Sequence, residues 1–275
     1  MRALATAPAA RGLEDDAAVL EIGNETLVIT HDTIVEGVHV RESDDLADVA
    51  WKLIAVNLSD LAAKGAEPLG VLVSHMLGDG DERFVTGLDD VLESYDVSLL
   101  GGDTISAAGR RAWGCTAIGR ATSSPVPDRR GARSGDAIYV TGPLGAAMLG
   151  FEGVGEFERA YLRPKPLLNE GIELAPQVSA MMDISDGLLL DANRMARTSG
   201  MTFALESARI PVVDEARFED CIRWGDDYQL LFTAAPETAL PTAATRIGSV
   251  LDEGPAPILL DGSPPAANRP LGYQH

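Results

Sequence analysis

The residues best suited to chemistry in this sequence are aspartates at the ends or inside of apolar segments. Six places carry them: Asp15 and Asp16, Asp32, Asp60, Asp103, Asp183 and Asp186, and Asp226 and Asp227. Any one of these places alone can be a helix cap or a turn, since aspartate is favoured in both. Six of them are hard to explain as six separate caps. Carboxylate oxygens bind hard cations such as Mg²⁺, together with waters and substrate phosphates. The pattern therefore predicts a metal-dependent enzyme that handles a phosphorylated ligand by positioning and charge neutralisation, as phosphoryl transfer requires.

The sequence lacks the motifs of several other chemistries. The histidines have no zinc-binding spacing, and there is no phosphate-binding P-loop, dinucleotide fingerprint or nucleophile elbow. A net charge of −20 disfavours a general nucleic-acid binder, because phosphate backbones need basic patches. No apolar run is long enough to cross a membrane. The two cysteines form no CxxC motif, which fits a reducing cytoplasm.

Both halves of the chain show mixed strand and helix patterns. In the first half we expect a strand–loop–strand unit, a helix, a strand and a helix over residues 25–40, 46–64, 68–77 and 81–96. "VSLLGGDT" is expected to be a strand running into a glycine turn, and "RAWGCTAIGRA" a further strand. Residues 122–136 are rich in Pro, Ser and Arg and are typical of a linker. We therefore predict an α/β (α+β) protein with domains at 1–121 and 122–275 and some antiparallel strand pairs.

The segment "IAVNLSDLAAKGAEP" places polar residues inside an otherwise apolar helix. Trp51 and Leu53, just before it, are expected to pack in the core. Asp60 alone reads as a cap or a surface residue, but with the other acids it reads as a metal ligand held by a packed helix. Asn57 has two interpretations: it orients Asp60, or it bonds to the backbone. Lys64 is assigned to the surface.

Seven segments, in this order, resemble the thiamine-monophosphate kinase family: "DDAAVL", "LVITHDTIVEGVH", "WKLIAVNLSDLAAKGAEPLG", "LLGGDT", "RSGDAIYVTGPLG", "MMDISDGLLLD" and "GDDYQLLF". This family shares a superfamily with aminoimidazole ribonucleotide synthetase and selenophosphate synthetase. The resemblance implies a two-domain α/β fold whose N-terminal domains pair in a homodimer. It also implies ATP bound without a P-loop, and several Mg²⁺ ions. The implied reaction is direct transfer of the γ-phosphoryl group to thiamine monophosphate, which gives thiamine diphosphate and ADP in the cytoplasm.

The resemblance also implies roles for individual residues. The implied metal ligands are Asp15, Thr30, His31, Asp32, Asp60, Asp103, Asp183 and Asp186. The implied nucleotide contacts are Gly102, Asp103, Arg129 and Ser185, and the implied substrate contacts are His39, Asp226 and Tyr273. Catalysis is expected to depend on Asp32, Asp60, Asp103 and Asp183. His31 can contribute its main-chain carbonyl instead of its imidazole. No general base is assigned, because the acceptor phosphate oxygen is already deprotonated near neutral pH.

Four residues depart from the family's pattern. Glu14 stands where glycine is usual, and Val85 where an aromatic residue often lies near the nucleotide. Asp226 and Gln229 replace two glutamates, and the shorter Asp226 reaches less far toward a substrate. Two alternatives follow: another ATP-dependent enzyme of the superfamily, or a catalytically weakened nucleotide-binding homologue. Selenophosphate synthetase itself would need a reactive cysteine near the N-terminus, which this sequence lacks.

Overall fold

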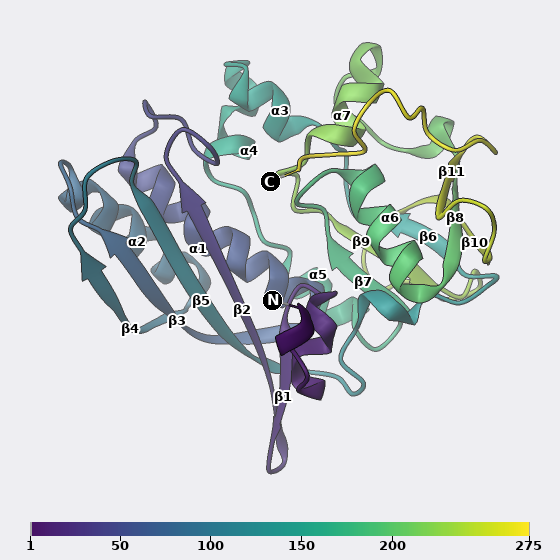
Figure 1. Ribbon diagram of the computed structural model, residues 1–275, viewed down its shortest axis with the longest axis horizontal. Helices are drawn as coiled ribbons and strands as arrows, with labels where there is room; N and C mark the ends of the chain where they lie inside the picture. Colours follow the sequence, from purple (N-terminus) through teal and green to yellow (C-terminus); the bar gives the residue numbers. More distant parts are fainter. Residues whose placement is uncertain (1, 275) are drawn as a thin grey trace.

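The computed structural model describes residues 2–274, and within them two β-sheets are each accompanied by helices (Figure 1). The first sheet has the order β1-β2-β5-β3-β4, with β1 Ala18–Ile22, β2 Glu25–Val35, β3 Ala66–Met76, β4 Ser98–Ile105 and β5 Ala112–Ala121. The second has the order β11-β8-β10-β6-β9-β7, with β6 Ala137–Val140, β7 Ala180–Asp183, β8 Met201–Leu205, β9 Leu230–Ala234, β10 Thr245–Asp252 and β11 Ile258–Leu260. The helices are α1 Leu46–Ala63, α2 Asp81–Tyr95, α3 Ala146–Phe151, α4 Glu158–Leu162, α5 Leu168–Leu174, α6 Leu188–Ser199 and α7 Phe218–Trp224. Among residues 2–274, no helix combines the length and the apolar character that a membrane crossing requires.

Most neighbouring strands are antiparallel, as expected, and the β3–β4 pair is parallel. Two details of the first sheet differ from expectation. The second strand predicted within residues 25–40 is replaced by an isolated bridge between Glu36 and Val40. The predicted glycine turn is also wrong, because Gly101 and Gly102 lie inside β4. A Cβ on Gly102 would lie 1.9 Å from the carbonyl oxygen of Val73, so glycine here allows close approach of β3 rather than a turn.

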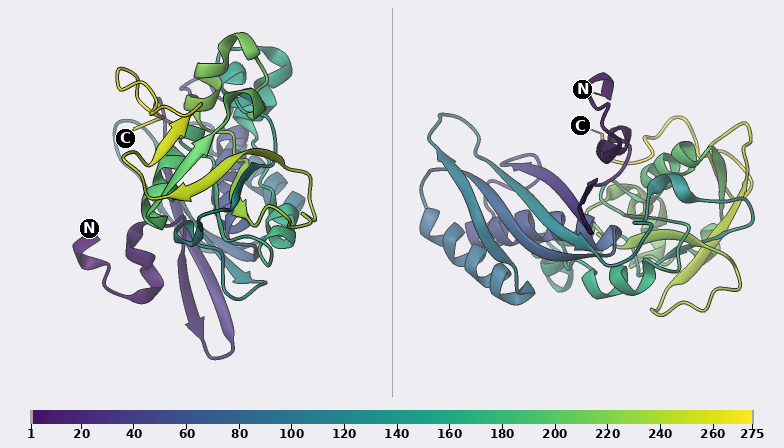
Figure 2. Two further views of the ribbon diagram at one scale, coloured as in Figure 1. Left: turned by 90° about the vertical axis from the view of Figure 1, so that its right-hand side faces the viewer. Right: turned by 90° about the horizontal axis from the view of Figure 1, so that it is seen from below.

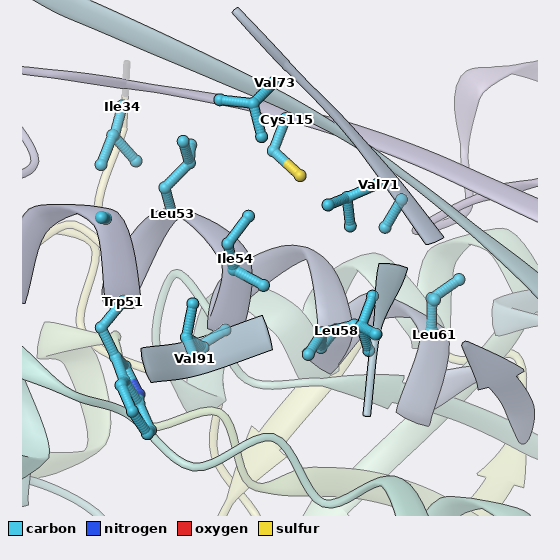
Figure 3. Packing of buried hydrophobic residues seen from close by; sticks show 14 of the residues in the cluster. Ile34, Trp51, Leu53, Ile54, Leu58, Leu61, Val71, Val73, Val91 and Cys115 are labelled. Carbon is cyan, nitrogen blue, oxygen red and sulfur yellow. The ribbon is translucent and has the colours of Figure 1, made fainter. Parts of the chain in front are cut away.

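Helix α1 is the centre of the first half and is buried along nearly its whole length. It begins after Asp45, whose side chain accepts a hydrogen bond from the backbone N–H of Ala47. Figure 3 shows its apolar residues between the sheet and Val91 of α2. The expected core positions of Trp51 and Leu53 are confirmed, with exposed fractions of 8% and 0%. Burying a leucine fully contributes roughly 1.5–3 kcal/mol, so this packing holds the helix rigidly.

The C-terminal end of α1 extends into the second half of the molecule. Ala62 and Ala63 belong to an apolar cluster with Leu174 of α5 and Met181 of β7. Gly171 of α5 lies so close to α1 that a Cβ there would be 2.0 Å from the carbonyl oxygen of Ala62. The prediction that Lys64 lies on the surface is wrong, because its exposed fraction is 0%. The domain boundary after residue 121 stays a prediction, and β5 ends at that residue.

The second sheet is packed against α6, and their shared core includes Ile138, Leu189 and Phe203. The loop before α6 follows β7 directly, so the acids of "DISDG" lie where a strand ends and a helix starts. The chain then returns after β11 toward the middle of the molecule, where its C-terminal end lies between the two halves (Figure 1).

The first sheet has its helices on one side. Figure 2 shows α1 and α2 on that side, with the opposite face uncovered. Strands β3 and β4 leave several large apolar side chains exposed, namely Leu72, Leu99, Leu100 and Ile105, at 39%, 50%, 54% and 54%. An exposed apolar sheet with a free edge strand is prone to pair with another chain.

Candidate active site

Three aspartates from distant parts of the sequence meet in a cleft lined by both halves. Carboxylate oxygens of Asp16, Asp60 and Asp183 lie within 4.8 Å of one another. Asp16 precedes β1, Asp60 lies on α1 and Asp183 ends β7. The cleft around them has a volume of about 520 Å³. An all-oxygen donor set of this kind suits Mg²⁺ better than a softer metal.

Helix α1 positions the acids through residues on neighbouring turns. The Asn57 side chain accepts a hydrogen bond from the backbone N–H of Asp32 at 3.1 Å and donates one to the carbonyl of Leu53 at 2.8 Å. Of the two interpretations of Asn57, the structure therefore shows the backbone one, and the residue it holds is Asp32 rather than Asp60. Ser59 donates to Asp183 Oδ2 at 2.6 Å. One helix thus fixes β2 and β7 against each other.

Strand β2 presents alternate residues to the cluster. The Thr30 hydroxyl donates to Asp60 and also reaches the carbonyl of Asp16 at 3.3 Å. Asp32 follows on the same face and lines the cleft. His31 lies on the opposite face, where its Nδ1 is 2.8 Å from the Thr116 hydroxyl. A contact of His31 with a metal in this cleft would therefore use its main chain.

Two cations pair with Asp16, one at each carboxylate oxygen. Arg129, in the segment that links the two halves, pairs with Asp16 Oδ1. The Nζ of Lys64 lies 2.7 Å from Asp16 Oδ2 and 2.5 Å from Asp15 Oδ1. Asp15 also pairs with Arg11. Asp16, rather than its neighbour Asp15, is thus the acid that reaches Asp60 and Asp183.

The buried acids divide into two electrostatic types. Burial opposes ionisation of Asp16, but the charges of Arg129 and Lys64 outweigh it and hold its pKa below the ordinary value. Burial raises the pKa of Asp183 to about 8, and the charge of Asp16 adds to this. Burial and the charges of Asp32, Asp183 and Asp16 raise the pKa of Asp60 well above its ordinary value. A cation beside Asp60 and Asp183 would relieve this repulsion.

The turn between β7 and α6 supplies a second group of polar residues. Asp186 pairs with Arg194 of α6, and its backbone N–H donates to Asp191 Oδ2 at 3.0 Å. Gly187 has φ +108°, and a Cβ there would lie 2.6 Å from the carbonyl of Arg223, so the turn requires glycine. Ser185, Asp186, Arg129 and Arg194 all line the cleft. Two guanidinium groups and a hydroxyl are suited to binding phosphate oxygens.

Five aromatic residues line the cleft, namely Phe151, Tyr161, Trp224, Tyr228 and Tyr273. Phe151 packs against both Tyr161 and Trp224, which makes these three one aromatic group. The rings of Phe151 and Trp224 have centroids 5.2 Å apart. Such a wall suits a flat heteroaromatic ligand, and more so a cationic one.

Asp226 lies beside these aromatic residues, and side chains of both halves of the molecule bind it. Its Oδ2 is 2.6 Å from the Nζ of Lys52 on α1, and its Oδ1 accepts a hydrogen bond from the Tyr228 hydroxyl at 3.0 Å. His39 also lines the cleft, and its Nδ1 accepts a hydrogen bond from the N–H of Val35 at 3.0 Å. The backbone N–H of Tyr273 donates to the carbonyl of Asp186 at 2.9 Å, which anchors the C-terminal segment over the site. The three predicted substrate contacts are therefore brought together.

Gly102 and Asp103 are not brought to this cleft within one chain. Asp103 is exposed on β4 and faces Ser74 of β3, at the other edge of the sheet from β1. Val85 stands where the family often has an aromatic residue near the nucleotide. It is 61% exposed on α2 and does not line the cleft. Gln229 bonds to the Thr141 hydroxyl at 2.9 Å and lies outside the cleft as well.

Several residues of the site were not among the ligands and contacts predicted from the sequence. Asp16, Lys52, Arg194 and Trp224 line the cleft, and Ser59 lies buried behind it and bonds to Asp183. Ser59 and Lys52 lie on the same helix as Asp60. In the sequence they occupy positions whose spacing is that of buried core residues, so they did not stand out as functional. The sequence did contain a signal for Arg194, because it follows Asp191 by three residues, a spacing at which two helix side chains can pair. In the structure Arg194 pairs with both Asp191 and Asp186.

Two family models match the chain in succession. The N-terminal domain of the AIR synthase related proteins matches residues 14–121, and their C-terminal domain matches residues 133–252. These matches, with the two sheets and the acid-lined cleft, define the class as a two-domain AIR synthase related protein.

Individual relatives narrow the class. The thiamine-monophosphate kinase of Caulobacter vibrioides is 35% identical over 84% of this chain and 73% of its own length. The thiamine-monophosphate kinase of Escherichia coli is 35% identical over 86% of this chain and 81% of its own. The solved structure "Thiamine Monophosphate Kinase (thil) from Aquifex Aeolicus" is 30% identical, with a TM-score of 0.82 over 92% of this chain and 94% of that one. The chain belongs to the thiamine-monophosphate kinase family. The resemblance and the two-domain fold expected from it are confirmed.

Another solved structure describes ligands. "AaThiL complexed with AMPPCP and TMP" is 31% identical to this chain, with a TM-score of 0.84 over 91% of this chain and 88% of that one.

Proposed function

We propose that this protein uses ATP to phosphorylate thiamine monophosphate, giving thiamine diphosphate and ADP. The observation that carries the proposal is the cleft itself, which is lined by acids, by two guanidinium groups and by five aromatic side chains. This arrangement suits a ligand with phosphates on one side and cationic heteroaromatic rings on the other. The homologous structure with AMPPCP and TMP supports the same pair of ligands.

The donor set fits Mg²⁺, and we propose that Asp16, Asp60 and Asp183 hold it, with Asp32 and Thr30 beside them. The fit rests on their clustered oxygens, and it is supported by the raised pKa values of Asp60 and Asp183, which follow from burial and from the charges of the neighbouring acids. When bound, Mg²⁺ would neutralise charge between two phosphorylated molecules. Asp186, in the turn after β7, lines the same cleft and is also suited to binding Mg²⁺.

The remaining cleft residues bind and orient. Arg129, Arg194 and Ser185 all line the cleft, and we propose that they hold phosphate oxygens. The aromatic wall would exclude water from the ring end, and Asp226 would accept hydrogen bonds from the substrate. Its pairing with Lys52 and Tyr228 fixes the shorter aspartate side chain where the family has glutamate.

We further propose a cytoplasmic homodimer that pairs through the uncovered side and free edge of the first sheet. The exposed apolar residues of β3 and β4 support this, because a second copy would cover them. In that dimer Gly102 and Asp103 lie at or near the interface, so their predicted roles depend on assembly. Both cysteines are buried thiols, in keeping with a reducing compartment.

The test is turnover with ATP, Mg²⁺ and thiamine monophosphate, measured as thiamine diphosphate by chromatography. We expect product from the wild type. Asp60→Asn should lower kcat by about a thousandfold, the size of loss seen when a charge-stabilising group is removed. Its melting temperature without metal should be equal or higher, since one repelling charge is gone. Asp89→Asn, an exposed aspartate on α2, is the matched control and should behave as wild type.

Absence of thiamine diphosphate at saturating substrates would reject the kinase and favour a weakened nucleotide-binding homologue. Equal turnover by Asp60→Asn and wild type would reject the proposed metal site alone.

A further inference from the structure

Lys64 is a cation sealed inside the protein at the edge of the acid cluster. It follows the last residue of α1, and its side chain is 0% exposed. Its Nζ lies 2.5 Å from Asp15 Oδ1, 2.7 Å from Asp16 Oδ2 and 3.0 Å from the carbonyl of Met181. Two of these contacts are hydrogen bonds, to Asp15 and to the Met181 carbonyl, and the contact with Asp16 is an ion pair.

Lys64 and its partners join three separate parts of the fold. Asp15 and Asp16 precede β1, Lys64 directly follows α1, and Met181 lies in β7 of the second half. A buried ammonium is tolerated only when it is paired and hydrogen-bonded, so this position is a specific one. Lys64 does not line the cleft, so it does not touch a ligand there. Any effect on the reaction must act through the acids it holds.

Asp15 has little capacity left for a metal. One of its oxygens pairs with Arg11, and the other accepts from Lys64 and from the backbone N–H of Asp16 at 3.0 Å. Asp16 is flanked by Arg129 and Lys64. Asp60 and Asp183 instead receive hydrogen bonds from the neutral hydroxyls of Thr30 and Ser59. Positive charge is therefore concentrated at one end of the cluster.

We propose that Lys64 is a resident counter-cation of the acid cluster, which occupies the Asp15 end in place of a divalent ion and confines Mg²⁺ to the Asp60 and Asp183 end. This inference rests on the proposed Mg²⁺ site. It makes Lys64 a positioning residue, and it removes Asp15 from the ligands that the sequence suggested. It also predicts that Lys64 weakens divalent-ion binding by repulsion while it stabilises the metal-free protein.

The test compares wild type with Lys64→Met, which keeps an unbranched side chain one atom shorter and removes its charge. Mn²⁺ binding is measured by electron paramagnetic resonance, and melting temperature is measured with EDTA and with Mg²⁺. We expect Lys64→Met to bind Mn²⁺ more tightly, on the order of tenfold. In EDTA this variant should melt at a lower temperature than wild type. Adding Mg²⁺ should raise its melting temperature by more than it raises that of wild type. Lys165→Met is the control: it removes the charge of an exposed lysine that does not line the cleft, and it should not alter Mn²⁺ affinity.

A second variant keeps the proposal testable if Lys64→Met folds poorly. The double variant Asp15→Asn with Lys64→Met removes both charges of the pair, so it should melt above Lys64→Met and fold in EDTA. It should bind Mn²⁺ more tightly than the Asp15→Asn single variant, which keeps Lys64. Equal Mn²⁺ affinity with and without Lys64 would overturn the counter-cation role but not the kinase. Failure of wild type to bind Mn²⁺ would overturn the metal site on which both depend.

Discussion

At the scale of single residues, the cluster shows that chemically identical side chains have different surroundings. Asp16 has two cationic partners, whereas Asp60 and Asp183 have hydroxyl partners. Burial favours the neutral form of all three acids, and it raises the pKa values of Asp60 and Asp183, whereas at Asp16 the charges of Arg129 and Lys64 outweigh it and lower the pKa. The metal-free protein therefore carries stored repulsion at Asp60 and Asp183, which ligand binding can release.

This difference predicts how stability changes with pH. Burial raises the pKa of Asp183 to about 8 and that of Asp191 to about 7, from an ordinary value of 3.8. Between about pH 4 and pH 8 the native state holds more protons than the unfolded state. The free energy of unfolding should fall as pH rises through this window, by up to about 1.4 kcal/mol per pH unit for each group. Asp16 has the opposite effect, because its lowered pKa stabilises the native state. That stabilisation is lost only when the pH falls below the ordinary pKa of aspartate, outside this window.

Urea unfolding in EDTA at pH 5.5, 7.0 and 8.5 measures this slope. Mg²⁺ should flatten it by binding the ionised acids. A free energy of unfolding that increases with pH in EDTA would contradict the prediction.

The sequence predicted Asp60 and Asp183 as metal ligands, but it could not show which of two adjacent aspartates joins them. Asp15 and Asp16 are adjacent and identical, and only the direction of the chain before β1 turns Asp16 to the cluster and Asp15 to Arg11. Lys64 was assigned to the surface because lysine usually lies there. Its burial depends on β7, which lies 116 residues or more further along the chain, as shown by its bond to Met181.

At the scale of elements, α1 does most of the positioning. Lys52, Asn57, Ser59, Asp60 and Lys64 all project from it or its last turn, toward partners on both sheets. Its existence and its bounds could be predicted, since an 18-residue apolar helix is a strong pattern. The course of β4 could not, because glycine pairs favour turns in general, and only contact with β3 explains Gly102 inside a strand.

The contact between α1 and α5 can be tested directly. Gly171→Ala should destabilise the protein by roughly 1–3 kcal/mol, because the added methyl group would collide with the carbonyl of Ala62 and push the helices apart. Alanine is otherwise the better helix former, so a loss would come from packing. Urea unfolding measures it, with Gly155→Ala as control, where an added Cβ meets no atom within 4 Å. Equal stability of the Gly171→Ala variant and wild type would show that α5 can shift freely.

At the scale of the whole molecule, the uncovered sheet face is the largest feature that one chain leaves unexplained. The pairing of N-terminal domains was implied by the resemblance, and the structure supplies a surface for it. The sequence could not identify this face, because residues such as Leu72 alternate with buried Val71 and Val73 and look like core positions.

We expect the wild type to sediment at twice the chain mass of 29.0 kDa. Leu72→Glu should shift it toward 29.0 kDa, because a charge would be buried between the copies. Leu251→Glu, at a similarly exposed leucine on β10, should leave the assembly intact. Analytical ultracentrifugation distinguishes these outcomes. A wild type that sediments as a single chain would contradict the proposed pairing.

The passage of α1 from one half into the other has a consequence for how such proteins diverge. The helix is encoded with the first half, yet its last turn is shaped to fit Leu174 and Met181 of the second. A second half taken from another relative must place a carbonyl oxygen against Lys64 and a glycine opposite Ala62. New combinations of halves by recombination should therefore fail unless the end of α1 changes with them, so the two halves are expected to be inherited as one unit.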